Sequence, residues 1–312
     1  MRHGFLKTLL PVIILLANID VQGQSTMLIA SKNNNQPLPY ASVVNLTKQR
    51  LFFSNENGKL EHDFESGDSI IISHVGYIDF KSRYIENKSS TIYLALNTQL
   101  LSEVKLRPCT KEKVSEYSNL EGDSSGRLFG GLHCGENPLN SKVAILLEPA
   151  ESNSYLESIS IWLEKFYSAP RKSIQAPIKF SFYEKSDSTG LPGEILSERT
   201  LLYHPKKPGK QTINTDSLHI KIPANGLYLS IEFPLDEKYA YPVKLIYIET
   251  GKTNTTKFYG PRLAGIYSAK NVLAFYNYLQ RNWHFAINRS KEDMYKTHGT
   301  IKFSYTVKSC VE

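Results

Sequence analysis

Residues 69–77 read Ser-Ile-Ile-Ile-Ser-His-Val-Gly-Tyr and lie at the centre of a compact, β-rich pattern. Three consecutive isoleucines are typical of a buried strand, because β-branched side chains pack well on a pleated sheet. Gly76 follows the run, and glycine readily adopts backbone angles that end a strand. The segment therefore predicts a short core strand that leads into a tight turn.

Short strands are expected on both sides of this segment. Leu60–Phe64 alternates apolar and polar side chains, as a half-buried strand should. The turn before it, Asn55–Gly58, ends in a glycine that can take a positive φ. The other expected strands of the region are Met27–Ala30, Ala41–Leu46, Leu51–Ser54, Ile78–Tyr84, Thr91–Leu96 and Leu101–Leu106. Short strands at this spacing, without helical periodicity, predict an all-β sandwich.

Four pieces of this region occur in an order that resembles a known family. They are Leu38-Pro39-Tyr40-Ala41-Ser42-Val43, Asn57-Gly58-Lys59-Leu60, Ile72-Ser73-His74-Val75-Gly76-Tyr77 and Leu100-Leu101-Ser102-Glu103-Val104. On these pieces, residues 24–106 are similar to the carboxypeptidase-regulatory-like domain common in exported proteins of Bacteroidetes-type bacteria. The resemblance covers about a quarter of the chain. It implies a transthyretin-like (prealbumin-like) seven-stranded β-sandwich without peptidase activity, because this accessory module carries none of the peptidase metal ligands.

Two departures from the family pattern are visible. The first strand, Met27–Ser31, lacks the usual Gly-x-Val-x-Asp sequence. His74 and Val75 also stand where the family more often has Tyr and then Ile or Leu. These differences leave the expected fold unchanged.

The N-terminus has the composition of a secretory signal peptide. Arg2 and Lys7 precede the apolar run Leu9–Ala17, and Gly23 precedes Gln24. The run is shorter than the roughly 20 apolar residues that a membrane span needs. We expect a signal peptide over residues 1–23, cleaved after Gly23, and an exported protein that is periplasmic, outer-membrane-associated or secreted. No transmembrane span is expected after cleavage; a buried N-terminal helix or a single anchor is the alternative.

Charge gives little information about partners. The 312 residues carry a formal net charge of +7, and the basic residues are scattered. The densest group, Lys206–Lys210, is expected to be a solvated turn, with an anionic-ligand patch as the alternative. Nothing resembles a nucleic-acid-binding module, so we expect no nucleic-acid partner. No cofactor is expected either.

Three cysteines, Cys109, Cys134 and Cys310, are an odd number for an exported chain. One disulfide with one free thiol and three free thiols are both compatible with the sequence, which does not choose a pairing. A metal site is disfavoured, because no Cys-x-x-Cys motif or pair of histidines supplies ligands at local spacing.

The second half of the chain again shows strand patterns. Residues 107–129 are polar and rich in Ser and Gly, and they are interpreted as a linker. Residues 130–312 are expected to form a larger, jelly-roll-like β-sandwich. Gly190–Glu194 and Ile222–Glu232 resemble an uncharacterised β-sandwich often found after the accessory module, which implies architecture only. The expected strands are Lys142–Leu147, Leu156–Glu164, Ile178–Tyr183, Leu218–Ile222, Leu227–Phe233, Val243–Glu249, Val272–Tyr278, His284–Ile287 and Thr300–Val307.

Three local motifs suggest catalysis, but each lacks its structural context. Gly122–Gly126 fits Gly-x-Ser-x-Gly without the preceding buried strand or the following helix of a nucleophile elbow. His62 and Glu65 have metallopeptidase spacing, yet residues three apart in a strand point to opposite faces. His133 and Cys134 are adjacent, and adjacent residues rarely form a thiol–base pair. We therefore predict that the protein is not an enzyme.

Aromatic residues are the remaining ligand candidates. A sugar-stacking platform could be formed by Trp162, Trp283, Tyr276 and Tyr278, although core packing is the simpler explanation. Tyr239–Pro242 and Lys257–Gly260 are expected on loops, where exposed aromatic rings could contact a ligand. The candidate ligand-contact residues are Tyr241, Tyr259 and Trp283.

The sequence thus predicts a non-catalytic, exported, two-domain β protein with an interaction or structural role at the cell envelope. Its partner would be an envelope protein or a glycan. The alternative is a carbohydrate- or polymer-binding module that uses aromatic loops of the C-terminal domain, and a hydrolase assembled from distant residues ranks third. The first two hypotheses differ in whether aromatic residues converge in an exposed groove. The oligomeric state is left open.

Overall fold

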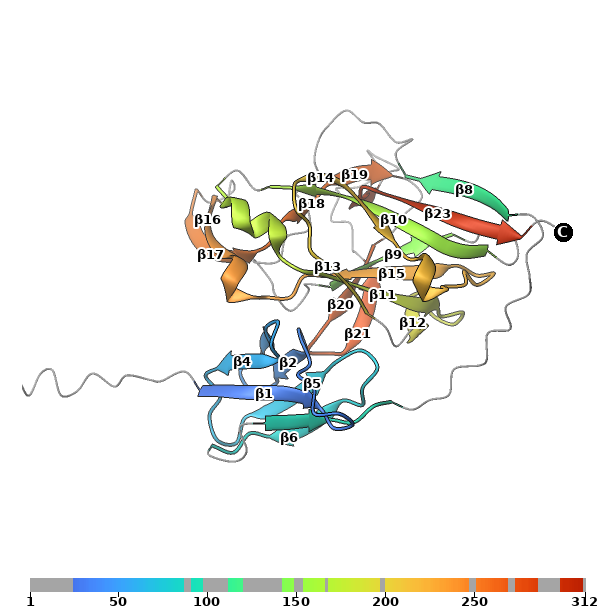
Figure 1. The fold of residues 1–312 in the computed structure, drawn as a ribbon. Coiled ribbons are helices and arrows are strands. Elements are labelled where there is room, and N and C mark those ends of the chain that lie inside the picture. Colours follow the sequence, from blue (N-terminus) through green and yellow to red (C-terminus); the bar gives the residue numbers. More distant parts are fainter. Residues whose placement is uncertain are drawn as a thin grey trace, which may run out of the picture.

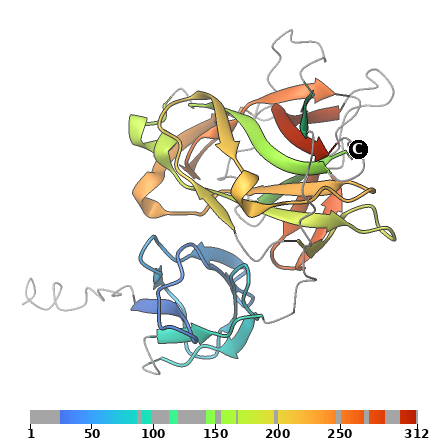
Figure 2. The same cartoon turned by 45° about the vertical axis from the view of Figure 1, so that its right-hand side comes forward.

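The computed structural model describes residues 25–86, 91–97, 112–119, 142–148, 154–165, 168–196, 200–246, 251–268, 273–285 and 298–310. Their regular structure is almost all β, as expected, with three short 3-10 helices: η2 (Arg171–Gln175), η3 (Asp216–Leu218) and η4 (Glu237–Tyr239). Figures 1 and 2 show two bodies, which we call the N-terminal unit (β1–β7) and the C-terminal unit (β8–β23). The expected signal peptide, Cys109, Cys134, the Gly122–Gly126 motif and His133 lie outside the described residues.

The N-terminal unit contains seven strands in two sheets, ordered β4-β1-β7 and β3-β2-β5-β6. The pairing of β1 with β7 is parallel, and the other pairings in the unit are antiparallel. The sheets enclose a core that includes Ile29, Val43, Leu60 and Ile72. The strands are β1 (Ser25–Ser31), β2 (Ser42–Asn45), β3 (Arg50–Phe53), β4 (Lys59–His62), β5 (Ser69–Ser73), β6 (Phe80–Arg83) and β7 (Thr91–Leu94). The strand expected at Leu101–Leu106 lies outside the described residues.

The isoleucine run explains how this unit meets the rest of the protein. Ile70 and Ile72 point into the core of the N-terminal unit. Ile71 points to the opposite face of the sheet and is only 8% exposed, because it lines a pocket against the C-terminal unit. Strands buried on both faces have continuous apolar sequences rather than alternating ones. The run is therefore continuous because β5 lies between two packed layers.

The C-terminal unit is built around two larger sheets, and the strand pairings among its described residues are antiparallel. The five-stranded sheet has the order β14-β10-β23-β8, with β18 beside β10. The seven-stranded sheet has the order β12-β11-β15-β9-β20-β21, with β13 beside β11. Side chains from both sheets, such as Ile159 of β10 and Phe180 of β11, form one large core between them.

The strands of the five-stranded sheet are β8 (Glu112–Ser118), β10 (Ser154–Glu164), β14 (Gly209–Asn214), β18 (Arg262–Leu263) and β23 (Phe303–Cys310). The strands of the seven-stranded sheet are β9 (Lys142–Leu147), β11 (Ile178–Lys185), β12 (Pro192–Ile195), β13 (Leu201–Tyr203), β15 (Leu227–Glu232), β20 (Leu273–Asn277) and β21 (Asn282–Phe285). Two further pairs are β16 (Ala240–Ile246) with β17 (Thr253–Tyr259), and β19 (Gly265–Ser268) with β22 (His298–Ile301).

Two expectations about this half of the chain are wrong. The segment interpreted as a linker, residues 107–129, contains β8, which pairs with β23 over seven residues from Glu112↔Cys310 to Ser118↔Ser304. Its polar sequence is that of a largely exposed edge strand. Leu218–Ile222 is not a strand, because η3 ends there and His219 takes a left-handed φ of 49°.

The part of the chain that the structure describes contains no helix with the length and hydrophobicity of a membrane span.

Candidate functional site

A pocket of about 380 Å³ lies between the two units. From the N-terminal unit it is lined by β2, β5 and the segment around His74–Tyr77, and from the C-terminal unit by side chains of β9, β11, β15 and β20. Figure 1 shows β20 and β21 extending toward β2 and β5, where the two bodies approach each other. The volume is within the range of roughly 300–1,000 Å³ that is typical of small-molecule sites.

A row of charged residues crosses the seven-stranded sheet beneath this pocket. Glu232 of β15 pairs in register with Lys179 on one side and with Lys142 on the other. Directly opposed residues on a sheet have side chains within contact distance on one face. Alternation places all three on the outer face, since their neighbours in sequence enter the core of the C-terminal unit.

These three charged residues are buried, although they lie on an outer face. Lys142, Lys179 and Glu232 are 9%, 5% and 4% exposed. The N-terminal unit covers them, and Lys179 Nζ donates a hydrogen bond to the backbone oxygen of Tyr40 at 3.1 Å. Their burial therefore depends on the contact between the two units.

Glu232 has its negative charge balanced within the protein. Its carboxylate forms an ion pair with Lys179 at 3.1 Å and accepts a hydrogen bond from the Tyr278 hydroxyl. A buried carboxylate requires such partners, because removing an ion from water is costly.

Lys142 has a different environment, made mainly of aromatic rings. Its Nζ donates a hydrogen bond to Tyr183 Oη at 2.5 Å. The same atom lies 4.9, 5.0 and 5.4 Å from the ring centroids of Tyr183, Tyr276 and Trp283, which are cation–π distances. Burial lowers the pKa of Lys142, but Tyr183 and Glu232 outweigh it, so the net shift is upward and the ammonium stays protonated.

His74 is a neutral member of the pocket lining. Burial, followed by the charge of Lys179, lowers the pKa of His74 to about 4. Its two ring nitrogens lie 3.0 Å from Val75 O and 3.2 Å from Pro39 O. A neutral imidazole has one N–H, so it can donate to only one of these carbonyl groups at a time.

The two units are also joined by an apolar contact and an ion pair. Val44, Leu51 and Phe53 pack against Tyr278, and the Phe53 and Tyr278 rings meet edge to face at 6.3 Å. Arg281, in the turn between β20 and β21, forms an ion pair with Asp79 of the N-terminal unit. The pocket is therefore held by contacts that involve both units.

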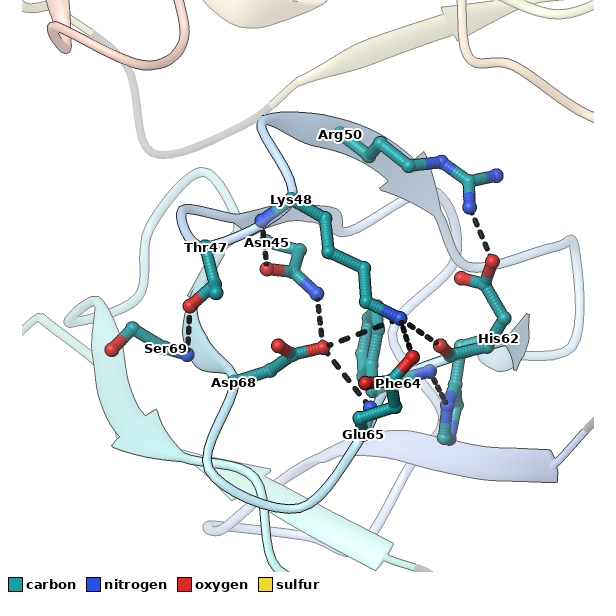
Figure 3. Close-up of polar contacts among 10 residues, drawn as sticks. Asn45, Thr47, Lys48, Arg50, His62, Phe64, Glu65, Asp68 and Ser69 are labelled. Carbon is teal, nitrogen blue, oxygen red and sulfur yellow. Dashed lines mark hydrogen bonds and ion pairs between the residues drawn. The ribbon is translucent and has the colours of Figure 1, made fainter.

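A polar cluster away from the pocket fixes the turns of the N-terminal unit (Figure 3). Asp68 accepts hydrogen bonds from the Asn45 amide at 2.7 Å and from the backbone N–H of Glu65 at 3.0 Å. Burial raises the pKa of Asp68, but these hydrogen bonds and the charge of Lys48 together lower it by more. The pKa of Asp68 therefore lies below its ordinary value. The cluster is explained by its structural role of connecting β2 to the turn before β5.

His62 and Glu65 point to different partners in the same view (Figure 3). The His62 ring stacks on Phe64 at 4.3 Å, and its Nδ1 accepts the backbone N–H of Phe64 at 3.3 Å. Glu65 forms an ion pair with Lys48 at 2.8 Å. The two side chains therefore do not converge on a position that one metal ion could occupy.

The structure separates the three aromatic residues proposed from the sequence. Tyr241 lies in β16, is 5% exposed and donates its hydroxyl hydrogen bond to Gly260 O at 3.0 Å. Tyr259 lies in β17 and donates a hydrogen bond to Glu237 at 2.9 Å. Trp283 lies in β21, outside the pocket lining, and its ring contacts Tyr183 and Tyr276, which line the pocket. The expectation that Tyr241 and Tyr259 lie on loops is wrong, because β16 and β17 pair along seven residues.

Three of the four residues considered as an aromatic platform do come together. Tyr276 contacts Tyr278 and Trp283 at centroid distances of 5.0 and 5.2 Å. Trp162 is elsewhere, on β10, with Lys210 and Lys302 over its ring at 5.3 and 5.0 Å. Of these three, Tyr276 and Tyr278 line the pocket, and Tyr278 is buried, as core packing would have it.

Sequence reasoning missed the charged part of the site. Lys142, Lys179 and Glu232 stand on the polar side of strands whose other face is apolar, and alternation alone would assign them to solvent. The burial of all six residues of β15, with both of its faces covered, is visible only in the structure.

No protein-family model and no curated protein matches the chain. Among solved structures, it is similar to the cysteine protease and lectin-like domains of Cwp84, a surface-layer-associated protein of Clostridium difficile, at 8% identity and a TM-score of 0.36, covering 82% of this chain and 48% of that one. A second structure of clostridial Cwp84, after propeptide cleavage, matches at 12% identity and a TM-score of 0.35, covering 82% and 54%. The structure of the Gx strain of infectious bursal disease virus matches at 9% identity and a TM-score of 0.20, covering 93% and 61%.

This chain spans about half the length of the two clostridial structures. At such low scores and identities, the similarity assigns neither a function nor a ligand to this chain.

Proposed function

We propose that this is a non-catalytic, exported protein of the cell envelope that binds a glycan or a similar extracellular polymer between its two β units. The observation that carries the proposal is the convergence of Tyr183, Tyr276 and Tyr278 at a pocket lined by polar groups of both units. Aromatic rings with polar tips suit sugar rings, which have apolar faces and hydroxyl edges.

A binding role is favoured over a catalytic one by the state of the polar groups. Glu232 is engaged by Lys179 and Tyr278, and both nitrogens of His74 lie near backbone carbonyls. A general base needs a free lone pair directed at substrate. These side chains instead orient one another, as groups that shape a binding pocket do.

The remaining parts of the proposal rest on the sequence. The N-terminal signal-peptide pattern supports export, and the order of motifs in residues 24–106 supports a carboxypeptidase-regulatory-like module. A structural or protein-partner role at the envelope is the second candidate, because the resemblance of residues 24–106 to this module is equally compatible with such a role.

The test is binding of the mature chain, residues 24–312, to a broad glycan and polysaccharide array, repeated with Tyr276→Ala, a change in a residue that lines the pocket. We expect micromolar or tighter binding that falls at least tenfold in the variant, because an aromatic contact is lost. Tyr259→Ala is the matched control, since Tyr259 lies in β17, outside the pocket lining.

Absence of binding to every glycan would contradict the polymer-binding proposal and favour an envelope-protein partner. Equal loss in Tyr276→Ala and Tyr259→Ala would also contradict a site at the pocket. Thermal unfolding of each variant shows whether its fold is retained.

A further inference from the structure

We propose that the pocket selects a saccharide that carries a carboxylate, such as a uronic acid, and that the carboxylate pairs with Lys142. This inference rests on the proposed function and specifies the chemical class of the ligand. It is carried by the charges at the pocket and by the hydrogen-bond donors that Lys142 and Tyr183 present there.

The first argument is a charge balance over the pocket lining. The described lining residues include three cations, Lys142, Lys179 and Arg281, and two carboxylates, Glu232 and Asp79. Lys179 is paired with Glu232, and Arg281 is paired with Asp79. Within the described part of the chain, no carboxylate lies within the 4.0 Å ion-pair distance of Lys142. One positive charge is therefore left over.

The second argument is the environment of that charge. Lys142 is 9% exposed, so its ammonium has little access to bulk water. The three aromatic rings around it offset part of the lost hydration through cation–π attraction. A buried ammonium without a carboxylate remains costly, and an anion entering the pocket would remove much of that cost.

The third argument concerns the direction of the hydrogen bonds. An ammonium has three N–H donors, and Lys142 uses one of them for Tyr183 Oη. Because Tyr183 accepts this bond, its own O–H is directed elsewhere. Two N–H groups and one O–H group thus form a cluster of donors, and a carboxylate is an acceptor that matches such a cluster.

The charge balance also favours a carboxylate over a phosphate. A carboxylate brings one negative charge and neutralises the single unpaired cation. A phosphate group brings about −1.5 to −2 charges at neutral pH. It would leave excess negative charge beside the buried Glu232.

The experiment compares acidic and neutral forms of the same sugar by calorimetry with the mature chain. The probes are oligogalacturonate against its fully methyl-esterified form, and sialyllactose against lactose, both at moderate salt. We expect at least one acidic member to bind about tenfold or more tightly than its neutral partner, as a charge-assisted hydrogen bond would produce.

Variants then locate the preference. Lys142→Met should reduce the ratio of affinities for the acidic and the neutral sugar to nearly one. Tyr183→Phe, which keeps the ring and removes the hydroxyl, should reduce this ratio severalfold. Lys302→Met is the matched control: it removes the same charge beside Trp162 and should leave the preference intact. If Lys142→Met fails to fold, Tyr183→Phe and the comparison of acidic with neutral sugars on the unchanged protein still test the inference.

Each alternative outcome has a distinct meaning. Equal affinity for acidic and neutral sugars, or glycan hits that are all neutral, would overturn this inference and leave the proposed function standing. No glycan binding of any kind would overturn both. Competition by millimolar acetate with the same affinity as oligogalacturonate would show that the pocket takes free carboxylates, and the saccharide assignment would then be wrong.

Discussion

At the scale of single residues, Glu232 is a buried, ion-paired group at the interface between the units. It lies between two lysines in register on a sheet, forms an ion pair with Lys179 at 3.1 Å, and is 4% exposed. Alternation along β15 places it away from the core of the C-terminal unit, which its neighbours Ile231 and Phe233 enter. Glu232 is shielded from water because the N-terminal unit packs over this part of the sheet, where Tyr40 contacts the neighbouring Lys179.

We predict that Glu232→Gln lowers the free energy of unfolding by about 3–5 kcal/mol, because it leaves buried Lys179 without its counter-charge. Urea denaturation at neutral pH measures this change. The double variant Glu232→Met/Lys179→Met should recover most of the loss, since an apolar pair needs no charge compensation.

The matched control is Glu56→Gln, which breaks an exposed ion pair with Lys238 across the same interface. Exposed pairs contribute little, so the midpoint should hardly move. If Glu232→Gln and Glu56→Gln lowered the free energy of unfolding equally, the charged row of Lys142, Lys179 and Glu232 would be exposed to water in solution.

At the scale of elements, the turn from β3 to β4 depends on one glycine. Gly58 has a φ of +70°, and its N–H donates to Asn55 O at 3.0 Å. A Cβ atom added there would lie 2.8 Å from Ile29 O of β1, which is closer than real Cβ contacts. The turn was predicted from Asn55–Gly58, but its close approach to β1 depends on packing between strands.

Gly58→Ala should destabilise the protein by about 3 kcal/mol, because the left-handed conformation costs roughly 1–2 kcal/mol and the clash with β1 adds to it. Gly67→Ala is the control, since Gly67 also has a positive φ, +98°, but faces open space. Chemical denaturation of both variants separates the cost of the left-handed conformation, which both share, from the cost of the clash with β1, which only Gly58→Ala has. A loss no greater at Gly58 than at Gly67 would contradict the observed packing of the turn on β1.

At the scale of the whole molecule, the two units are joined through a contiguous apolar and polar interface. Phe53 of β3 is 7% exposed and packs on Tyr278, next to the ion pair of Arg281 with Asp79. Interfaces of this kind make two bodies unfold together when they contribute enough stability. The pocket exists only while they are joined.

We therefore predict a single cooperative transition for the natural chain in scanning calorimetry, and a split or broadened one for Phe53→Ser. The change removes a buried ring from the interface and leaves the core of the N-terminal unit unaltered, because Phe53 faces outward. Ile85→Ser, at a side chain that is already 49% exposed, should keep one transition. Two separate transitions in the natural chain would mean that the interface couples the units only weakly.

Local sequence was sufficient to predict the all-β class, most strands of the core and the turn at Asn55–Gly58. Such features follow from period-two alternation and from turn residues, which act between neighbours in the chain. The isoleucine run indicated a buried strand, and the structure adds that both of its faces are covered. The family resemblance and the domain boundaries stay predictions.

The binding site, in contrast, required the tertiary structure. Lys142, Lys179 and Glu232 lie on three different strands, and Asp79 meets Arg281 across about two hundred positions of sequence. The same alternation that marks an outward-facing charge cannot show whether water or another layer of protein lies outside. Tyr241 was misplaced and β8 was missed for the corresponding reason: burial and strand pairing depend on distant partners, which only the folded chain brings together.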